Sequence, residues 1–315
     1  MFRSSKNQMF DTTVFDVKTV LVLGAGASYH LGFPLGATLC QNILDNTSDP
    51  DSRTFKELMA MGFSKEQISA FHHEFAKSAA ATIDDFLSTR EEFVDIGRAS
   101  IAQELIKYED TAKLHRRTDN WFIQLREAIV AAAKTGQYAP VIVTFNYERS
   151  FDKYVVDLLE GTFGKQRAAQ LCDIVRIFHV HGKLGHLDSD NTSEFRRPYK
   201  QEATPQEILE SSKGIRVISE LKDDHGKDMA LARSAIKDAS RVLFLGFGYH
   251  SMNLHRLGVV DLFKGDTWPG KDKYIGTAMG MPKNRMKELA EQGQGRLVLD
   301  GTGASIQDFL QKHDW

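Results

Sequence analysis

Short, continuous apolar runs recur along this chain, and amphipathic stretches separate them. The runs are rich in β-branched and aliphatic residues, and each ends at a Gly, Asn, Asp or His: Thr19–Leu23, Val141–Thr144, Ile174–His179, Arg241–Leu245, Lys273–Thr277 and Arg296–Leu299. Apolar runs without strict alternation are typical of strands buried on both faces of a parallel sheet. Helical patterns such as Lys227–Ala239 and Pro282–Gln292 lie between several of them. We therefore predict an α/β fold with a doubly wound, mostly parallel sheet.

A different pattern fills residues 51–138. This stretch contains no strand pattern, and it holds two sequences of the capping-box type that begins helices. Apolar residues recur at helical spacing after the second of these sequences. We predict an all-helical insertion at 51–138 within a core domain formed by residues 1–50 and 139–315. The polar stretch His186–Gly214 is predicted to be a long loop.

Composition narrows the class of protein. The chain has 315 residues, of which 42% are hydrophobic and 26% charged, as in globular proteins. Its net charge of −2 argues against a surface that coats nucleic acid, so we expect no direct nucleic-acid partner. The first residues lack the apolar segment of a secretory signal, and no apolar stretch approaches the roughly 18 residues that span a bilayer. We expect a cytoplasmic protein without a membrane partner.

A glycine-containing turn directly follows the first apolar run. It reads Gly24-Ala25-Gly26-Ala27-Ser28. A buried strand that passes into a helix through such a turn presents backbone amides that can hold a diphosphate. The dinucleotide fingerprint places a third glycine where this chain has Tyr29. A tight strand-to-helix turn without a ligand is the alternative.

Three further motifs follow predicted strands, at the ends where α/β proteins bind ligands. They are Thr144-Phe-Asn146-Tyr-Glu148, His179-Val-His181-Gly182, and Gly246-Phe-Gly248 followed by Asn253. Each has a structural alternative. The amide of Asn146 could cap the following helix, the ring of His181 could be a hydrogen-bonded residue at a strand end, and the glycines could form a simple turn.

In this order, the four motifs resemble those of the sirtuin family. That family has a Gly-Ala-Gly-x-Ser turn, then Thr-x-Asn-x-acid, then His-Gly, then a glycine turn after a late strand. The resemblance covers the predicted core and implies a Rossmann-like, sirtuin-type sheet. Protein-deacylating sirtuins usually carry a zinc module of two Cys-x-x-Cys pairs, whereas this chain has only Cys40 and Cys172. Phe145 and Glu148 also replace the glutamine and aspartate that are common in the family.

The helical block Ile83–Arg90 resembles that of bacterial sirtuin-like proteins of antiphage defence. In that branch the resemblance implies hydrolysis of NAD to nicotinamide and ADP-ribose, so NAD is the substrate and the protein is an effector of abortive defence. Such an activity harms its host when unregulated. The resemblance therefore implies gating by homo-oligomerisation or by a partner in trans, such as a hexameric ATPase of the conjugation-motor type.

The resemblance also assigns roles to residues. Asn146 is expected to orient the nicotinamide ribose and the attacking water, and His181 to act as the general base, suited by its ordinary pKa near 6.5. The expected NAD-binding residues are Gly24, Ala25, Gly26, Ala27 and Ser28 at the diphosphate, Gly246, Gly248 and Asn253 at the adenosine half, Asp84 at the nicotinamide end, and Thr144. We expect no metal, since His179 and His181, even together with His186, do not have the geometry that metal ligands require.

Two other functions stay open from the sequence. One is a regulatory subunit that binds NAD or ADP-ribose without cleaving it, because the residues of the predicted phosphate turn indicate binding more directly than catalysis. The other is an NAD-dependent protein deacylase, which the absence of the zinc module disfavours.

Overall fold

A parallel sheet lies at the centre of the computed structural model, which describes residues 19–136, 139–217, 227–264, 273–301 and 303–312. Within these residues the sheet has six strands in the order β3-β2-β1-β4-β5-β6, and every pairing is parallel. The strands are β1 (Thr19–Leu23), β2 (Val141–Thr144), β3 (Ile177–His179), β4 (Arg241–Leu245), β5 (Tyr274–Thr277) and β6 (Leu297–Asp300). This is the strand order of a Rossmann-like sheet.

The prediction of an α/β fold with a parallel sheet is confirmed, since each of the six apolar runs contains a strand. The third strand begins later than predicted. Residues Cys172–Ile174 form a short 3-10 turn (η5), so β3 starts only at Ile177. An apolar run alone does not distinguish such a turn from the strand that follows it.

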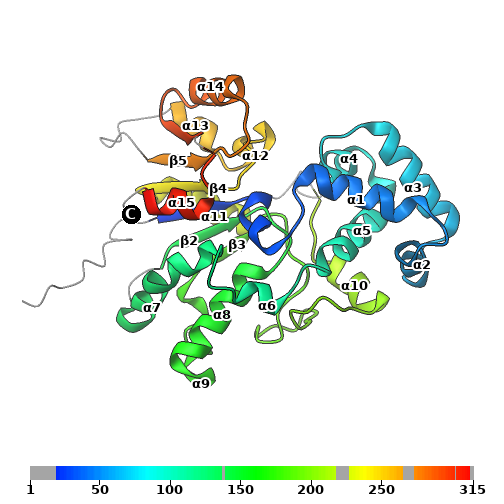
Figure 1. The fold of residues 1–315 in the computed structure, drawn as a ribbon, viewed down its shortest axis with the longest axis horizontal. Coiled ribbons are helices and arrows are strands. Elements are labelled where there is room, and N and C mark those ends of the chain that lie inside the picture. Colours follow the sequence, from blue (N-terminus) through cyan, green and yellow to red (C-terminus); the bar gives the residue numbers. More distant parts are fainter. Residues whose placement is uncertain (1–18, 137–138, 218–226, 265–272, 302, 313–315) are drawn as a thin grey trace, which may run out of the picture.

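Successive side chains of the central strands enter two different cores. Leu21 and Leu23 of β1 lie in one core, and Val20 and Val22 lie in the other. The first core receives side chains from α7 (Arg126–Thr135), α8 (Ser150–Phe163) and α15 (Ile306–Lys312). The second receives them from α11 (Lys227–Asp238), α12 (Ser251–Arg256), α13 (Val259–Lys264) and α14 (Lys283–Gln292). Helices therefore cover both faces of the sheet, which is a doubly wound arrangement (Figure 1).

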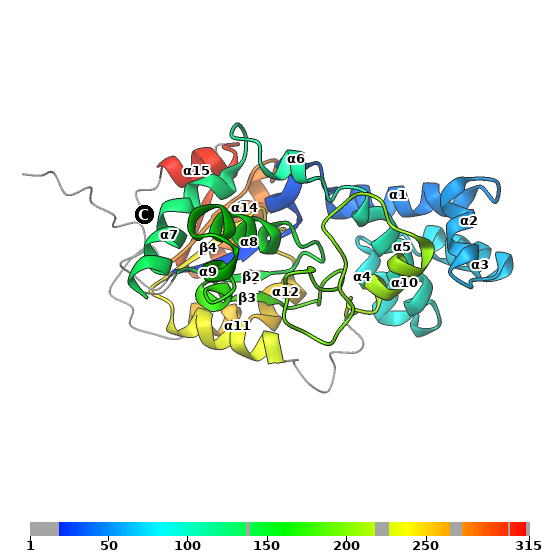
Figure 2. The same ribbon diagram turned by 90° about the horizontal axis from the view of Figure 1, so that it is seen from below.

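A second group of helices packs together to one side of the sheet (Figures 1 and 2). It comprises α1 (Gly36–Ser48), α2 (Arg53–Ala60), α3 (Lys65–Ser78), α4 (Ile83–Thr89), the turn η3 (Glu91–Phe93), α5 (Val94–Ile106) and α10 (Pro205–Ser212). Ser64 and Gln67 form a reciprocal capping box at the start of α3. Stacked and tilted aromatic rings, among them Phe71, Phe86 and Phe93, fill the interior of the group. We call these helices the helical group.

The membership of the helical group differs at both ends from residues 51–138. Helix α1 precedes this range but packs against α3 and α5, and α10 lies within the predicted loop His186–Gly214 but packs against α5. Conversely, α7 and the turn η4 (Trp121–Leu125) fall inside the range, yet they pack with α8 and α15 of the core. Amphipathic spacing shows that a helix buries one face, but it does not show which partner covers that face.

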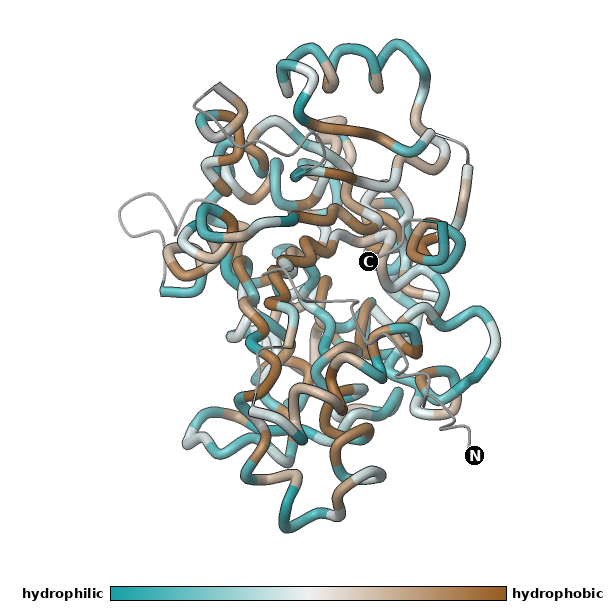
Figure 3. Tube along the Cα trace, turned by 90° about the vertical axis from the view of Figure 1, so that its left-hand side faces the viewer, coloured by the Kyte–Doolittle hydropathy of each residue, from teal (hydrophilic) through white to brown (hydrophobic). Residues whose placement is uncertain are grey.

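Polar turns lie at the periphery of the chain, whereas hydrophobic segments run through its interior (Figure 3). The 3-10 helix η2 (Ala25–Leu31) directly follows β1, and two short helices, α6 (Thr111–Leu114) and α9 (Lys165–Ala168), complete the described elements. Across the described ranges, no helix is both long enough and apolar enough to cross a membrane.

A buried charged triad connects the helical group to the core. Arg149, which precedes α8, donates hydrogen bonds to both carboxylate oxygens of Glu109, at 3.0 and 2.7 Å. Arg197 donates to the same carboxylate from the loop that leads to α10, and all three side chains are fully buried. Sequence reasoning did not identify this triad, because its members are far apart in the chain.

Candidate functional site

The direction of the strand order reverses at the centre of the sheet. From β1 the chain continues to β2 and β3 on one side, and β4 then pairs with the other edge of β1. In open α/β sheets, ligands bind beyond the carboxyl ends of the strands at such a reversal. The residues that follow β1, β2, β3 and β4 at this edge are the motifs that the sequence singled out.

The turns after β1 and β4 contact each other through their backbones. The amides of Gly24 and Gly26 donate to the carbonyl oxygens of Leu245 and Gly246, at 3.1 and 3.0 Å. Gly246 has a φ of +58°, and a Cβ atom there would lie 2.2 Å from the amide nitrogen of Ala27. A Cβ on Gly26 would lie 2.8 Å from the Cα atom of Gly246. The close approach that these glycines permit is therefore between the two turns.

This contact changes what the first turn offers to a diphosphate. The amides of Gly24 and Gly26 are already bonded, and the amide of Ala27 donates to the carbonyl of Gly24 at 2.8 Å. Ala25 is the exposed residue of the turn. The indole of Trp121 donates to the carbonyl of Ala27 at 2.8 Å and supports the turn from η4. In this arrangement Gly24, Gly26 and Ala27 shape the turn, and their backbone amides donate to carbonyl oxygens of the protein itself.

Gly248 and Asn253 lie after β4, as the sequence predicted. Gly248 is exposed, and a Cβ atom there would meet nothing within 4 Å. Asn253 is half-buried on α12, which starts three residues after Gly248. Gly246 thus has a steric reason to be glycine, whereas Gly248 has none in this structure.

Asn146 lies in a buried polar cluster that joins the ends of β1 and β2. Its Nδ2 atom donates to Ser28 Oγ at 3.2 Å and to Glu148 Oε1 at 3.4 Å, and Ser28 Oγ donates to the same Glu148 oxygen at 2.5 Å. Glu148 Oε2 accepts the amide of Ser150 at the start of α8, at 2.6 Å. The carboxylate of Glu148, and not the side chain of Asn146, therefore accepts an amide at the start of α8, and the capping alternative for Asn146 is wrong.

The remaining polar atoms of Asn146 are placed as follows. Its backbone amide donates to Thr144 Oγ1 at 3.0 Å. Thr144 therefore contacts the site through the backbone of Asn146. Within the described part of the chain, the Oδ1 atom of Asn146 has no hydrogen-bond partner. This oxygen is the atom of the side chain that can accept a hydrogen bond from a ligand hydroxyl or a water.

His181 lies just beyond β3 and is 4% exposed. The ring meets Phe145 edge to face at a centroid separation of 5.2 Å, and Arg256 Nη1 lies 3.2 Å from its Nε2 atom. Burial lowers the pKa of His181 to about 4, while Asp84 acts to raise it and Arg256 lowers it further. The expectation that this base keeps its ordinary pKa near 6.5 is therefore wrong, because the site is desolvated.

Asp84 reaches the same place from the helical group. It lies in the first turn of α4, and its Oδ1 atom accepts a hydrogen bond from the Tyr147 hydroxyl. Burial raises the pKa of Tyr147 well above 10, and the neighbouring carboxylate of Asp84 raises it further. Asp84 and Arg256 both act on His181, so the structure brings together Asp84, Asn146 and His181 around the residues after β2 and β3.

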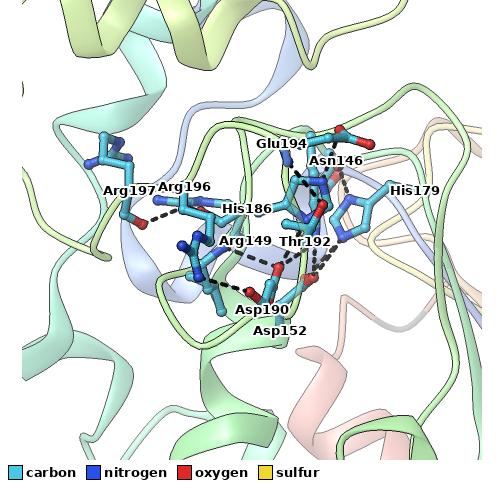
Figure 4. A network of polar contacts seen from close by, with 12 residues as sticks. Asn146, Arg149, Asp152, His179, His186, Asp190, Thr192, Glu194, Arg196 and Arg197 are labelled. Carbon is cyan, nitrogen blue, oxygen red and sulfur yellow. Dashed lines mark hydrogen bonds and ion pairs between the residues drawn. The ribbon is translucent and has the colours of Figure 1, made fainter.

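A second polar network begins at the backbone carbonyl of Asn146 (Figure 4). His179 connects Asn146 to Asp152 of α8, and Lys183 bridges Asp152 and Asp190 at 3.1 and 3.4 Å. Asp190 also bonds His186 at 3.1 Å, so the carboxylate of Asp190 is held by Lys183 and His186. Sequence reasoning missed Asp152, Lys183 and Arg256; only the His179-x-His181 spacing drew attention to part of this network.

No protein-family model and no curated protein sequence matches this chain. In the described ranges, no group of three or more His, Cys, Asp or Glu side chains has the arrangement of a metal site. The polar side chains described at this edge of the sheet are the amide of Asn146, the buried imidazole of His181, the carboxylates of Asp84 and Glu148, and the guanidinium of Arg256.

Proposed function

We propose that this protein hydrolyses NAD to nicotinamide and ADP-ribose. One observation carries the proposal: Asn146 and Ser28, 118 residues apart in the chain, bond to each other where the strand order of a Rossmann-like sheet reverses. This is the place where such sheets bind nucleotides. The ordered motifs that resemble those of sirtuins all lie at this edge.

The residue types suit cleavage of the glycosidic bond of NAD. Water attacks C1′ of the nicotinamide ribose, and the electron pair of the breaking C1′–N1 bond neutralises the pyridinium nitrogen. The leaving group needs no proton, so the protein must mainly hold the ribose and a water in place and accept the proton that the water loses. Asn146 is suited to the first task, because Ser28 and Glu148 fix its Nδ2 atom and leave Oδ1 to accept from a hydroxyl or water.

His181 is the proposed acceptor of the water proton. Because burial lowers its pKa to about 4, the ring is neutral at neutral pH and has one nitrogen with a lone pair. Arginine can only donate, so the lone pair of Nε2 faces Arg256 in this structure. His181 can act as the base only after this contact opens. That requirement agrees with a gated enzyme, which the sirtuin resemblance implies through homo-oligomerisation or a partner in trans.

A module that binds NAD or ADP-ribose without cleaving it is the second candidate. The contact between Arg256 and His181 favours it, because it leaves the proposed base without a free lone pair. An NAD-dependent deacylase receives less support, since a chain with two cysteines cannot form a four-cysteine zinc module.

Nicotinamide release tests the proposal. The protein is incubated with NAD at several concentrations of protein, alone and with the product of the neighbouring gene, and nicotinamide is quantified by chromatography. We expect release in at least one assembled state and its loss in Asn146→Ala and His181→Ala variants whose thermal unfolding matches the wild type. Unchanged turnover in these variants would refute the assigned roles. Tight NAD binding without product in every state would favour the binding module.

A further inference from the structure

His179 contacts the backbone of Asn146, whereas Ser28 contacts its side chain. His179 is the last residue of β3 and is 7% exposed. Its Nδ1 atom lies 3.2 Å from the backbone carbonyl oxygen of Asn146 (Figure 4). A carbonyl oxygen only accepts hydrogen bonds, so Nδ1 must be the donor.

The other nitrogen of the same ring faces a carboxylate. His179 Nε2 lies 2.9 Å from Asp152 Oδ2 and 3.2 Å from Oδ1. Asp152 belongs to the first turn of α8, and its Oδ1 atom also accepts from Lys183 Nζ at 3.1 Å. Burial alone would raise the pKa of Asp152, but His179 and Lys183 hold it below its usual range. Because both ring nitrogens face acceptors, a ring with a proton on each nitrogen satisfies both contacts.

These contacts fix the backbone of Asn146 on two sides. Its amide donates to Thr144 Oγ1, and its carbonyl oxygen accepts from His179. A change at either contact turns a peptide plane next to the Asn146 Cα atom and so moves the side-chain amide. Catalytic groups lose much of their effect when they are displaced by about 1 Å.

We propose that His179, oriented by Asp152, is a positioning residue that sets the direction of the Asn146 side chain through the Asn146 carbonyl. The catalytic consequence of this role rests on the proposed NAD hydrolysis. The role itself concerns the conformation of Asn146, which can be observed without any reaction.

Two isosteric variants separate the contacts of the ring. The amide nitrogen of asparagine occupies the position of Nδ1, so His179→Asn keeps the donor to Asn146 and loses Asp152. The amide nitrogen of glutamine reaches the position of Nε2, so His179→Gln keeps Asp152 and loses the donor to Asn146. If His179 were needed only for stability, both variants should lose similar amounts of activity.

We expect His179→Gln to lower kcat for nicotinamide release by about tenfold or more with little change in KM, as misplaced catalytic groups do. His179→Asn keeps the donor to Asn146 but loses the orienting carboxylate, so it should lower kcat less than His179→Gln does. A second measurement uses the ¹⁵N–¹H signals of the Asn146 side-chain amide, assigned from the spectrum of Asn146→Asp. We expect these signals to shift in His179→Gln and to stay near their wild-type position in His179→Asn.

The outcomes distinguish the two proposals. Selective shifts of the Asn146 signals without nicotinamide release by the wild type would support the positioning role and overturn the proposed function. Release by the wild type with equal kcat in both variants, or with equal shifts of the Asn146 signals, would overturn the positioning role and leave the proposed function standing. Unfolding temperatures of both variants show whether either has lost its fold.

Discussion

The Nε2 atom of His181 and the Nη1 atom of Arg256 lie 3.2 Å apart. Since the guanidinium only donates, this contact places the ring proton of a neutral His181 on Nδ1. Arg256 is the last residue of α12, a helix of six residues that follows β4. The contact therefore couples the position of α12 to the availability of the proposed base.

Removal of the guanidinium should free the base. We expect Arg256→Met to raise nicotinamide release by the isolated chain at least about tenfold, because a free general base contributes roughly 10²- to 10⁴-fold. It should also raise the pKa of His181, since Arg256 lowers it. Steady-state release and an NMR titration of the histidine ring check both effects, with the half-exposed Arg285→Met as the control. Lower release in Arg256→Met would mean that the guanidinium assists the substrate instead of blocking the base.

The buried imidazole of His181 should make the protein sensitive to acid. Its pKa is 6.5 in a solvated chain and about 4 in the folded protein. Between these pH values the unfolded chain binds more protons than the folded protein, so the free energy of unfolding falls as the pH is lowered from about 6.5 to 4. Above pH 6.5 His181 is neutral in both states and causes no loss of stability. A shift of this size corresponds to about 3 kcal/mol. Urea unfolding at pH 7 and pH 4.5 should show a smaller loss for His181→Gln than for the wild type.

His30 supplies the comparison for that experiment. Burial also lowers the pKa of His30 to about 4, against the hydrogen bond with Asn120, and neither Arg256 nor Asp84 contributes to this shift. His30→Gln should reduce the acid sensitivity as well, without changing the titration of His181. Equal pH dependence in the wild type and in His181→Gln would contradict the lowered pKa of His181.

The two glycines after β4 should respond differently to the same substitution. Gly246→Ala places a Cβ atom against the backbone of the first turn and at a positive φ, so we expect a loss of about 1–3 kcal/mol in the free energy of unfolding. Gly248→Ala meets no atom within 4 Å and should be neutral. Thermal unfolding of the two variants measures the difference. Similar losses in both would show that the turns do not hold each other as the structure places them.

The sequence predicted the sheet well because buried parallel strands are recognisable locally. Apolar runs and the residues that end them identified all six strands, and β1 has the predicted bounds. The sequence also predicted the position of Asn146 and His181 at the carboxyl edge of the sheet, where they follow β2 and β3. What it could not predict were the contacts between distant segments. The contact between Arg256 and His181 depends on how α12 packs, and the hydrogen bond from Tyr147 to Asp84 depends on how α4 packs. No local sequence pattern encodes that packing.

The buried triad gives the last prediction. Glu109→Gln removes the charge that compensates Arg149 and Arg197 while keeping nearly the same side-chain volume. Breaking a buried ion pair by removing one partner costs about 3–5 kcal/mol, because the other charge is left buried without compensation. We expect urea unfolding to show a loss of this order. The half-exposed pair of Glu288 with Arg285 provides the matched control, and Glu288→Gln should change stability by less than about 0.5 kcal/mol.

Since the triad joins the loop before α10 to α8, Glu109→Gln should also increase proteolysis within residues 182–204 before the core is cleaved. Loss of stability without this selective cleavage would mean that the triad stabilises the whole chain and does not specifically anchor the helical group.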